Sequence, residues 1–152
     1  MLKIQIPPVQ IVDQNNDPID WSSIRSKYLL LYFYPKDMTP GCTTQACKIT
    51  ESWRELQALD CHVIGISKDS PRRHKTFIEK YDLPFTLLSD PEGKLCEHFD
   101  VWIKKSMFGK SYMGIERSSF LFDQNHELLH AWRKVKPADH IADVMAFIHS
   151  QD

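Results

Sequence analysis

The sequence lacks several features that mark common classes of protein. The formal net charge of its 152 residues is −1, so no excess of either sign points to nucleic acid or an anionic membrane as a partner. The longest apolar run, YLLLYFY at residues 28–34, is far too short to span a bilayer. Residues 1–10 hold one lysine and no sustained apolar segment, so we expect no secretory signal and a cytoplasmic location.

Several catalytic and ligand-binding motifs are also missing. The chain has no C-x-x-C, no glycine-rich phosphate loop, no G-x-S-x-G and no dinucleotide fingerprint. Its seven histidines are scattered, and none stands in a recognisable nucleophile–base arrangement. Cys96 and His98 lie close together, but no second Cys/His cluster has the spacing of a zinc site. We therefore expect neither a cofactor nor a metal.

Short apolar segments alternate with segments of helical periodicity, with no repeat and no linker between them. The pattern predicts strands at 28–34, 62–67 and 85–89, helices at 42–59, 71–81 and 137–150, a short helix within 91–99, and a hairpin of strands at 118–123 and 127–135. An early strand pair is expected around residues 2–12, and the stretch before residue 117 is expected to be irregular. This order predicts a single α/β domain over residues 1–152, with a mixed central sheet flanked by helices in three layers.

The four cysteines raise the question of chemistry, because structural disulfides are rare in the cytosol. Cys42 follows Pro40-Gly41 at the first turn of a predicted helix. Free backbone N–H groups and the positive end of the helix dipole favour a thiolate at such a place. Thr39 stands three residues earlier, where its hydroxyl can turn back toward the sulfur. A thiolate here would lie at the carboxyl end of a central strand, a usual place for α/β sites.

Cys47 is a second thiol five residues further along the same helix. On an ideal helix its Cα lies about 8.6 Å from that of Cys42, beyond the roughly 7 Å that a disulfide tolerates. A disulfide between them therefore requires the first turns of the helix to unwind. Thr43 and Thr44 are mediocre helix formers in that opening turn, which favours unwinding.

Core packing is the competing interpretation of these cysteines. The helix places an apolar stripe at Cys42, Ala46, Ile49, Trp53 and Leu56. A cysteine on such a stripe is more often a buried side chain than a nucleophile, and C-x4-C is a weaker redox pattern than C-x-x-C. The spacing alone leaves both interpretations open.

A longer motif adds a resemblance. The pattern P-x-x-x-T-x-x-C, here Pro35, Thr39 and Cys42, is similar to the active-site signature of the peroxiredoxins. The string YFYPKDMTPGCTTQAC resembles the bacterioferritin-comigratory, or Q-type, branch of that family. The resemblance continues in VIGISKDS, in YDLPFTLLSDPEGKLCEHFDVW and in KSYMGIERSSFLFD, and covers nearly everything from about residue 28 onward.

The resemblance implies a thioredoxin-like fold and an antioxidant thiol peroxidase that reduces hydrogen peroxide and organic hydroperoxides. Cys42 would be the peroxidatic cysteine, Thr39 would hydrogen-bond the thiolate and the peroxide, and Arg117 would hold both. Cys47 stands where this branch often has its resolving cysteine, which forms a disulfide that thioredoxin or a similar dithiol reduces. Many Q-type members are monomers, so the resemblance also favours a monomer.

The chemistry needs more than a thiolate. Raising the ionised fraction of a thiol at pH 7 from roughly 3% to roughly 90% gains only about 30-fold. The larger share of the rate must come from groups that stabilise charge on the breaking O–O bond, with Arg117, the Thr39 hydroxyl and the N–H groups near Cys42 as candidates.

Two other functions use the same fold and remain alternatives: a dithiol–disulfide oxidoreductase and a non-catalytic redox sensor. Cys61 is interpreted as core packing, whereas Cys96 keeps a possible redox role as another resolving cysteine. Trp102, Phe108 and Tyr112 are interpreted as either core or an apolar collar for organic peroxides.

Overall fold

The computed structural model describes residues 11–151. The predicted strand pair around residues 2–12 lies almost entirely outside this range. Within it, Val12 forms isolated bridges with Pro18 and Ser89. No helix among the described residues is long and apolar enough to cross a membrane.

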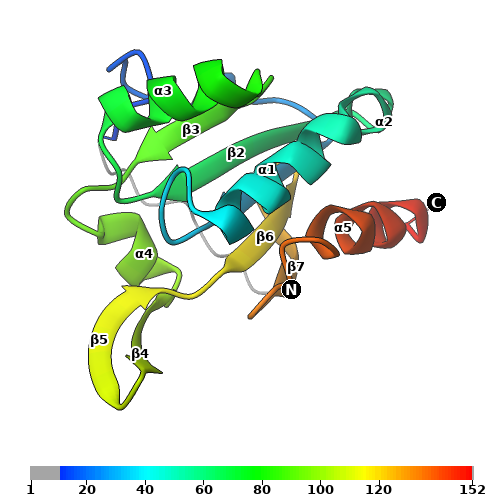
Figure 1. Ribbon diagram of the computed structural model, residues 1–152. Helices are drawn as coiled ribbons and strands as arrows, with labels where there is room; N and C mark the ends of the chain where they lie inside the picture. Colours follow the sequence, from blue (N-terminus) through cyan, green and yellow to red (C-terminus); the bar gives the residue numbers. More distant parts are fainter. Residues whose placement is uncertain (1–10, 152) are drawn as a thin grey trace.

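A five-stranded sheet forms the middle of the fold (Figure 1). Its strands stand in the order β3-β2-β1-β6-β7 and comprise β1 (Tyr28–Phe33), β2 (Cys61–Ser67), β3 (Thr86–Ser89), β6 (Ser118–Asp123) and β7 (Leu128–Trp132). Strand β2 pairs in parallel with both β1 and β3. Strand β6 pairs antiparallel with both β1 and β7. The prediction of a mixed sheet is confirmed.

Strand β1 lies at the centre of the sheet, and all six of its residues are buried. Alternate side chains point to opposite faces, so Leu29 and Leu31 pack in one apolar cluster while Leu30 and Tyr32 pack in the other. Both faces are covered, which explains the continuous apolar run in the sequence. Pro35 follows the strand.

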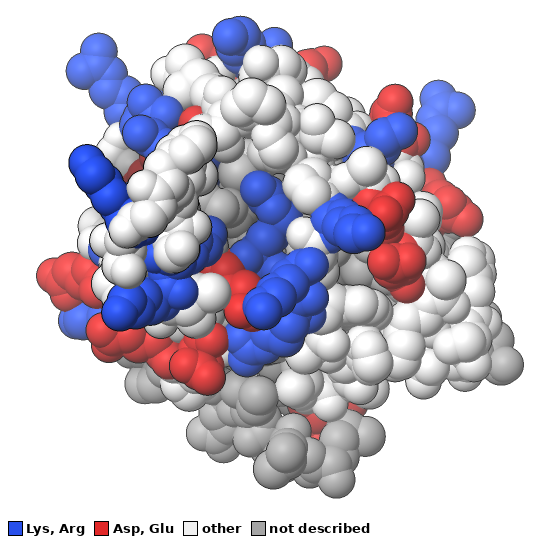
Figure 2. Space-filling model, turned by 60° about the horizontal axis from the view of Figure 1, so that its bottom comes forward, with Lys and Arg blue, Asp and Glu red and all other residues white. Residues whose placement is uncertain are grey.

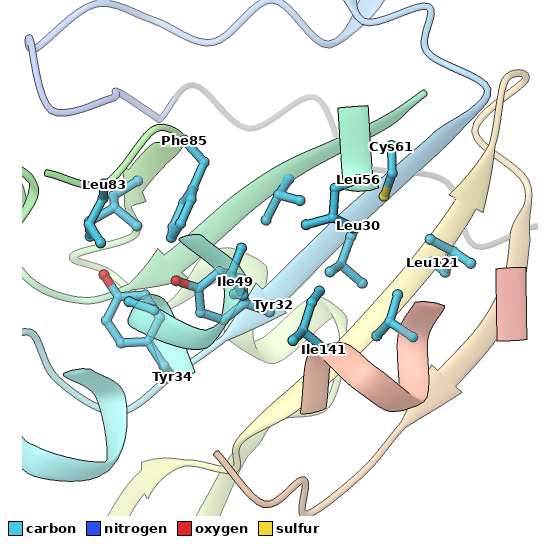
Figure 3. Packing of buried hydrophobic residues seen from close by; sticks show 14 of the residues in the cluster. Leu30, Tyr32, Tyr34, Ile49, Leu56, Cys61, Leu83, Phe85, Leu121 and Ile141 are labelled. Atoms are coloured by element: carbon cyan, nitrogen blue, oxygen red, sulfur yellow. The ribbon is translucent and has the colours of Figure 1, made fainter. Parts of the chain in front are cut away.

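Helices pack against both faces of the sheet. Helices α1 (Pro40–Glu51), α2 (Trp53–Ala58), α3 (Pro71–Tyr81) and α5 (His140–His149) contribute side chains to the cluster around Leu30 and Tyr32. Figure 3 shows Ile49 of α1, Leu56 of α2 and Ile141 of α5 in this cluster. Helix α4 (Lys94–His98) and the 3-10 helix η1 (Trp21–Ser23) contribute to the cluster on the opposite face. The predicted three-layer α/β architecture is confirmed.

The helix predicted over residues 42–59 is wrong in one respect, because the chain forms α1 and α2 with a break at Ser52. The Ser52 N–H donates to the carbonyl groups of both Lys48 and Ile49, and its ψ of 8° leaves the helical range. The apolar stripe continues through the break, since Ile49 and Leu56 are both fully buried. Periodicity therefore could not reveal it.

The stretch predicted to be irregular is instead a β-hairpin. Strand β4 (Trp102–Met107) pairs antiparallel with β5 (Lys110–Ile115), and Phe108-Gly109 forms the turn. Both turn residues have positive φ, 52° and 78°, as a two-residue hairpin turn of mirror-image type requires. The hairpin was missed because phenylalanine is not a usual residue for this turn. Most of its side chains are also exposed, so no apolar alternation marks the strands.

Candidate active site

Cys42 is the third residue of α1, and its side chain is only 2% exposed. The first hydrogen bond of the helix runs from Thr43 N to Thr39 O, at 2.9 Å. The N–H groups of Gly41 and Cys42 precede that bond and have no partner within the helix. The thiol therefore lies at the positive end of the helix dipole, as predicted.

Arg117 lies 75 residues after Cys42 in the sequence but next to it in the fold. It directly precedes β6, and the pairing of Phe33 with Ser118 sets it beside the carboxyl end of β1. Its Nη1 donates to Cys42 Sγ at 3.4 Å. A Cβ on Gly41 would lie 3.1 Å from Nη2, so glycine at this position lets the guanidinium pack against the start of the helix.

Gln45 is a site residue that the sequence interpretation missed. Its Oε1 accepts a 2.7 Å hydrogen bond from Arg117 Nη1, and its side chain is buried. Because it stands three residues after Cys42, it shares that face of α1 and holds the guanidinium over the thiol. Its Nε2 is buried with no partner among the described residues. A polar residue one turn from Cys42, on an otherwise apolar face, was the signal available in the sequence.

Thr39 is the N-cap residue of α1, but its side chain does not cap the helix. The hydroxyl donates to the carbonyl oxygen of Lys36 at 2.9 Å. The hydrogen thus points away from the sulfur, which differs from the predicted orientation. The left-handed conformation of Met38, with φ of 64°, turns the loop so that this carbonyl lies within reach. The oxygen lone pairs of Thr39 remain able to accept a hydrogen bond.

Tyr32 on β1 and Lys105 on β4 interact electrostatically with both Cys42 and Arg117. Burial raises the pKa of Tyr32 well above its usual value, and the negative charge of Cys42 adds to this, so the phenol stays neutral. Burial lowers the pKa of Lys105, as does nearby Arg117, while the charge of Cys42 raises it. Figure 2 shows Lys and Arg side chains gathered around a hollow in the face that is turned forward there.

The other cysteines differ in their surroundings, although all four are free thiols. Cys47 is half-buried within the intact helix α1. Burial raises the pKa of Cys61 to about 12. Burial also raises the pKa of Cys96, and the Asp90 carboxylate adds to this effect. Cys61 and Cys96 therefore remain protonated at neutral pH, which makes both of them poor nucleophiles.

Comparison with known proteins identifies relatives of this chain. Residues 3–131 match the model of the AhpC/TSA family. The chain is 50% identical over 139 residues to peroxiredoxin Bcp of Bacillus subtilis, covering 91% of this chain and 88% of the relative. The chain belongs to the AhpC/TSA family. Peroxiredoxin Bcp of Escherichia coli is 42% identical over 134 residues, covering 88% of this chain and 86% of the relative.

A solved structure extends the likeness to three dimensions. The bacterioferritin comigratory protein of Xanthomonas campestris, described for its alkyl peroxide reduction activity, matches with a TM-score of 0.88 and 34% identity. The match covers 97% of this chain and 96% of that one. The predictions of a peroxiredoxin, of a peroxidase and of a thioredoxin-like α/β fold are confirmed.

Proposed function

We propose that this peroxiredoxin reduces hydrogen peroxide and organic hydroperoxides at Cys42. The observation that carries the proposal is the Cys42 sulfur at the start of α1, with Arg117 Nη1 at 3.4 Å. The alkyl peroxide reduction attributed to the Xanthomonas campestris relative supports the inclusion of organic hydroperoxides.

In the first step, the Cys42 thiolate attacks one oxygen of the peroxide and the O–O bond breaks. The other oxygen leaves with the bonding electrons, takes a proton and departs as water or an alcohol, while Cys42 becomes a sulfenic acid. Negative charge moves from the sulfur to the leaving oxygen. Arg117 and the N–H groups of Gly41 and Cys42 stabilise that charge along its path, with Gln45 holding the guanidinium in place.

Thr39 and Pro35 shape the site from the loop between β1 and α1. Because the Thr39 hydroxyl hydrogen is committed to Lys36 O, its oxygen serves as an acceptor for the O–H of a peroxide. This contact would orient the peroxide with its reacting oxygen toward Cys42. Pro35 lies two residues after the end of β1, and its fixed φ sets the direction in which the loop leaves the sheet.

In the second step, the Cys47 sulfur attacks the Cys42 sulfenic acid, forming a disulfide and releasing water. Both residues belong to the intact helix α1, so the first turns of that helix must open. Thioredoxin or a similar dithiol protein then reduces the disulfide by exchange, itself becoming oxidised and returning two thiols to this chain.

The proposal includes the setting of the reaction. We place a single catalytic domain over residues 1–152, acting as a monomer in the cytoplasm. A reducing compartment supports the cycle, because Cys42 and Cys47 must return to the thiol form after each turnover. Light scattering of the purified chain tests the monomer directly.

A coupled assay with thioredoxin, its reductase and NADPH tests the cycle. We expect the wild type and Cys96→Ser to consume peroxide over many turnovers, and Cys42→Ser to consume none. With thioredoxin as the reductant, Cys47→Ser is expected to consume one equivalent of peroxide and then stop. Reduction of insulin without peroxide consumption would instead identify a dithiol–disulfide oxidoreductase. A wild type that stops after one equivalent would identify a redox sensor.

A further inference from the structure

Asp37 lies in the loop between β1 and α1 and is bound through every polar atom it has. Its N–H donates to Asp69 Oδ2 at 2.8 Å, and its carbonyl oxygen accepts from Arg73 Nη2 at 3.1 Å. Its carboxylate accepts from the Tyr34 hydroxyl at 2.5 Å on one oxygen. The other oxygen lies 2.6 Å from His74 Nδ1. The residue is 1% exposed, and the two bonds to its carboxylate are buried.

His74, on α3, is completely buried and is bonded through both ring nitrogens. Its Nε2 lies 3.0 Å from the carbonyl oxygen of Leu88, the third residue of β3. A carbonyl oxygen only accepts, so Nε2 carries a hydrogen. The Asp37 carboxylate lies at Nδ1 on the opposite side of the ring. His74 thus joins the β1–α1 loop to β3 through a single buried ring.

A metal site is the other interpretation of this cluster, since ligand atoms of Asp37, Asp69 and His74 lie within 4.8 Å of one another. Protein donors already occupy these atoms. Asp69 Oδ2 accepts from Ser67 Oγ as well as from the Asp37 N–H. The candidate ligand atoms are therefore already hydrogen-bonded within the protein. We call Asp37, His74 and their hydrogen-bond partners the clamp.

The clamp stands just before the part of the chain that the chemistry needs. Asp37 precedes the N-cap residue Thr39 by two positions and Cys42 by five. Met38, between Asp37 and Thr39, is in the left-handed conformation, with φ of 64°. The start of α1 is thus held from one side by Arg117, at Cys42 and Gln45, and from the other by the clamp.

We propose that Asp37 and His74 are positioning residues. They fix the chain just before the first turns of α1, the segment that rearranges between the peroxide reaction and disulfide formation. The proposal rests on the proposed function, in which Cys47 resolves Cys42. The clamp stabilises the closed arrangement, in which Cys42 meets the peroxide, relative to the open one, in which it meets Cys47. Its loss shifts the population toward the open state. Such a shift slows the peroxide step and accelerates disulfide formation.

Two substitutions of His74 separate its two contacts. An asparagine amide nitrogen replaces Nδ1, so His74→Asn keeps a donor for Asp37. A glutamine amide nitrogen replaces Nε2, so His74→Gln keeps the bond to Leu88 O but loses Asp37. Tyr34→Phe removes a hydroxyl that donates to Asp37 and lies 3.3 Å from His74 Nδ1, and it serves as a milder variant. Phe77→Leu, on the buried face of α3, is the matched control for general destabilisation.

The experiment is stopped-flow tryptophan fluorescence of reduced protein mixed with hydrogen peroxide. A phase whose rate constant rises in proportion to the peroxide concentration reports the sulfenic acid, and a phase whose rate constant is independent of that concentration reports the disulfide. For His74→Gln we expect the first rate to fall and the second to rise, with the ratio of the second rate to the first increasing roughly tenfold, as loss of a hydrogen bond to a charged group implies. Tyr34→Phe should change both rates in the same sense but less. His74→Asn keeps a donor to Asp37 and should change both rates less than His74→Gln does. Phe77→Leu should not change the two rates in opposite directions.

The outcomes distinguish the two proposals. A wild type with no unimolecular phase would remove Cys47 as the resolving residue, and with it the basis of the clamp. A wild type with both phases, but with His74→Gln altering both rates in one direction or neither, would overturn the clamp alone. So would equal effects of His74→Asn and His74→Gln, or opposite changes in Phe77→Leu.

Discussion

Arg117 does more at this site than favour the ionised form of Cys42. Its Nη1 is shared between the sulfur and Gln45 Oε1, so the guanidinium is fixed before any peroxide arrives. Complete ionisation of an ordinary thiol at pH 7 gains only about 30-fold. A preorganised donor aimed at developing charge contributes roughly 100- to 1,000-fold by itself. The geometry therefore assigns Arg117 mainly to the transition state.

We expect Arg117→Ala to lower kcat/KM for hydrogen peroxide by roughly 100- to 1,000-fold. The measured fraction of thiolate at pH 7 should fall by much less. Arg117→Lys keeps the charge but loses the two-pronged geometry, and should recover only part of the rate. Rates come from peroxide consumption, and thiolate from absorbance at 240 nm. Arg54→Ala, on the exposed side of α2, is the control. Equal losses of rate and of thiolate would contradict this role.

Helix α1 must be intact when Cys42 meets the peroxide and must open when Cys42 meets Cys47. In the intact form it buries Cys42, Ala46 and Ile49 and presents its N–H groups to the site. Its opening turn contains Gly41, Thr43 and Thr44, which are weak helix formers. The cost of opening that turn is therefore small relative to opening the rest of the helix.

Formation of the Cys42–Cys47 disulfide should abolish amide-exchange protection over residues 42–48, because the bond is incompatible with helical spacing. Helices α2 and α3 should keep their protection. Hydrogen–deuterium exchange with mass spectrometry compares the reduced and oxidised forms, and Cys47→Ser treated in the same way is the control. An unchanged pattern in protein with a verified disulfide would rule out the opening of α1.

The β4–β5 hairpin contains a strained residue. Phe108 has φ of 52° and is 96% exposed, so its ring contributes almost nothing to packing. Phe108→Asn should raise the free energy of unfolding by about 1 kcal/mol, since asparagine tolerates this conformation. Urea denaturation measures the change. Phe108→Ala keeps the strain and should leave stability nearly unchanged, so equal effects of the two variants would contradict this reason.

Elements marked by an apolar run or by helical periodicity were predictable from the sequence, and features set by a single residue were not. The strands at 28–34, 62–67 and 118–123 match β1, β2 and β6 within one residue at each end. The break at Ser52 and the turn at Phe108 each depend on one backbone conformation, which leaves no periodic trace. At the site, Cys42, Thr39 and Pro35 share one motif. Arg117 was found only through resemblance, because the pairing of β1 with β6 that brings it near is a long-range contact.

The stability of the whole fold depends on the protonation state of a buried histidine. His140, the first residue of α5, is 1% exposed, and its Nε2 lies 2.5 Å from Ser119 Oγ on β6. Burial is the main cause that lowers its pKa to about 4, and the charge of Arg117 adds to this. The helix thus docks on the sheet through a neutral histidine.

This histidine makes stability depend on pH. Between about pH 6.5 and 4 the unfolded chain binds a proton at His140 that the folded chain does not, so stability falls as pH falls. From pH 7 to pH 5 the expected loss from this group is about 2 kcal/mol. Urea denaturation at both pH values should show a smaller loss for His140→Gln than for the wild type. His149→Gln, exposed on the same helix, should behave as the wild type does. An unchanged loss in His140→Gln would contradict this assignment.

In the proposed cycle, Cys42 reacts with peroxide and Cys47 resolves the resulting sulfenic acid. Fully reduced protein treated with one equivalent of hydrogen peroxide and then mapped by peptide mass spectrometry tests this most directly. We expect a Cys42–Cys47 link, with Cys61 and Cys96 still thiols. A stable sulfenic acid on Cys42, or a link from Cys42 to Cys96, would contradict the role of Cys47 and the opening of α1. No oxidation at Cys42 would contradict the claim altogether.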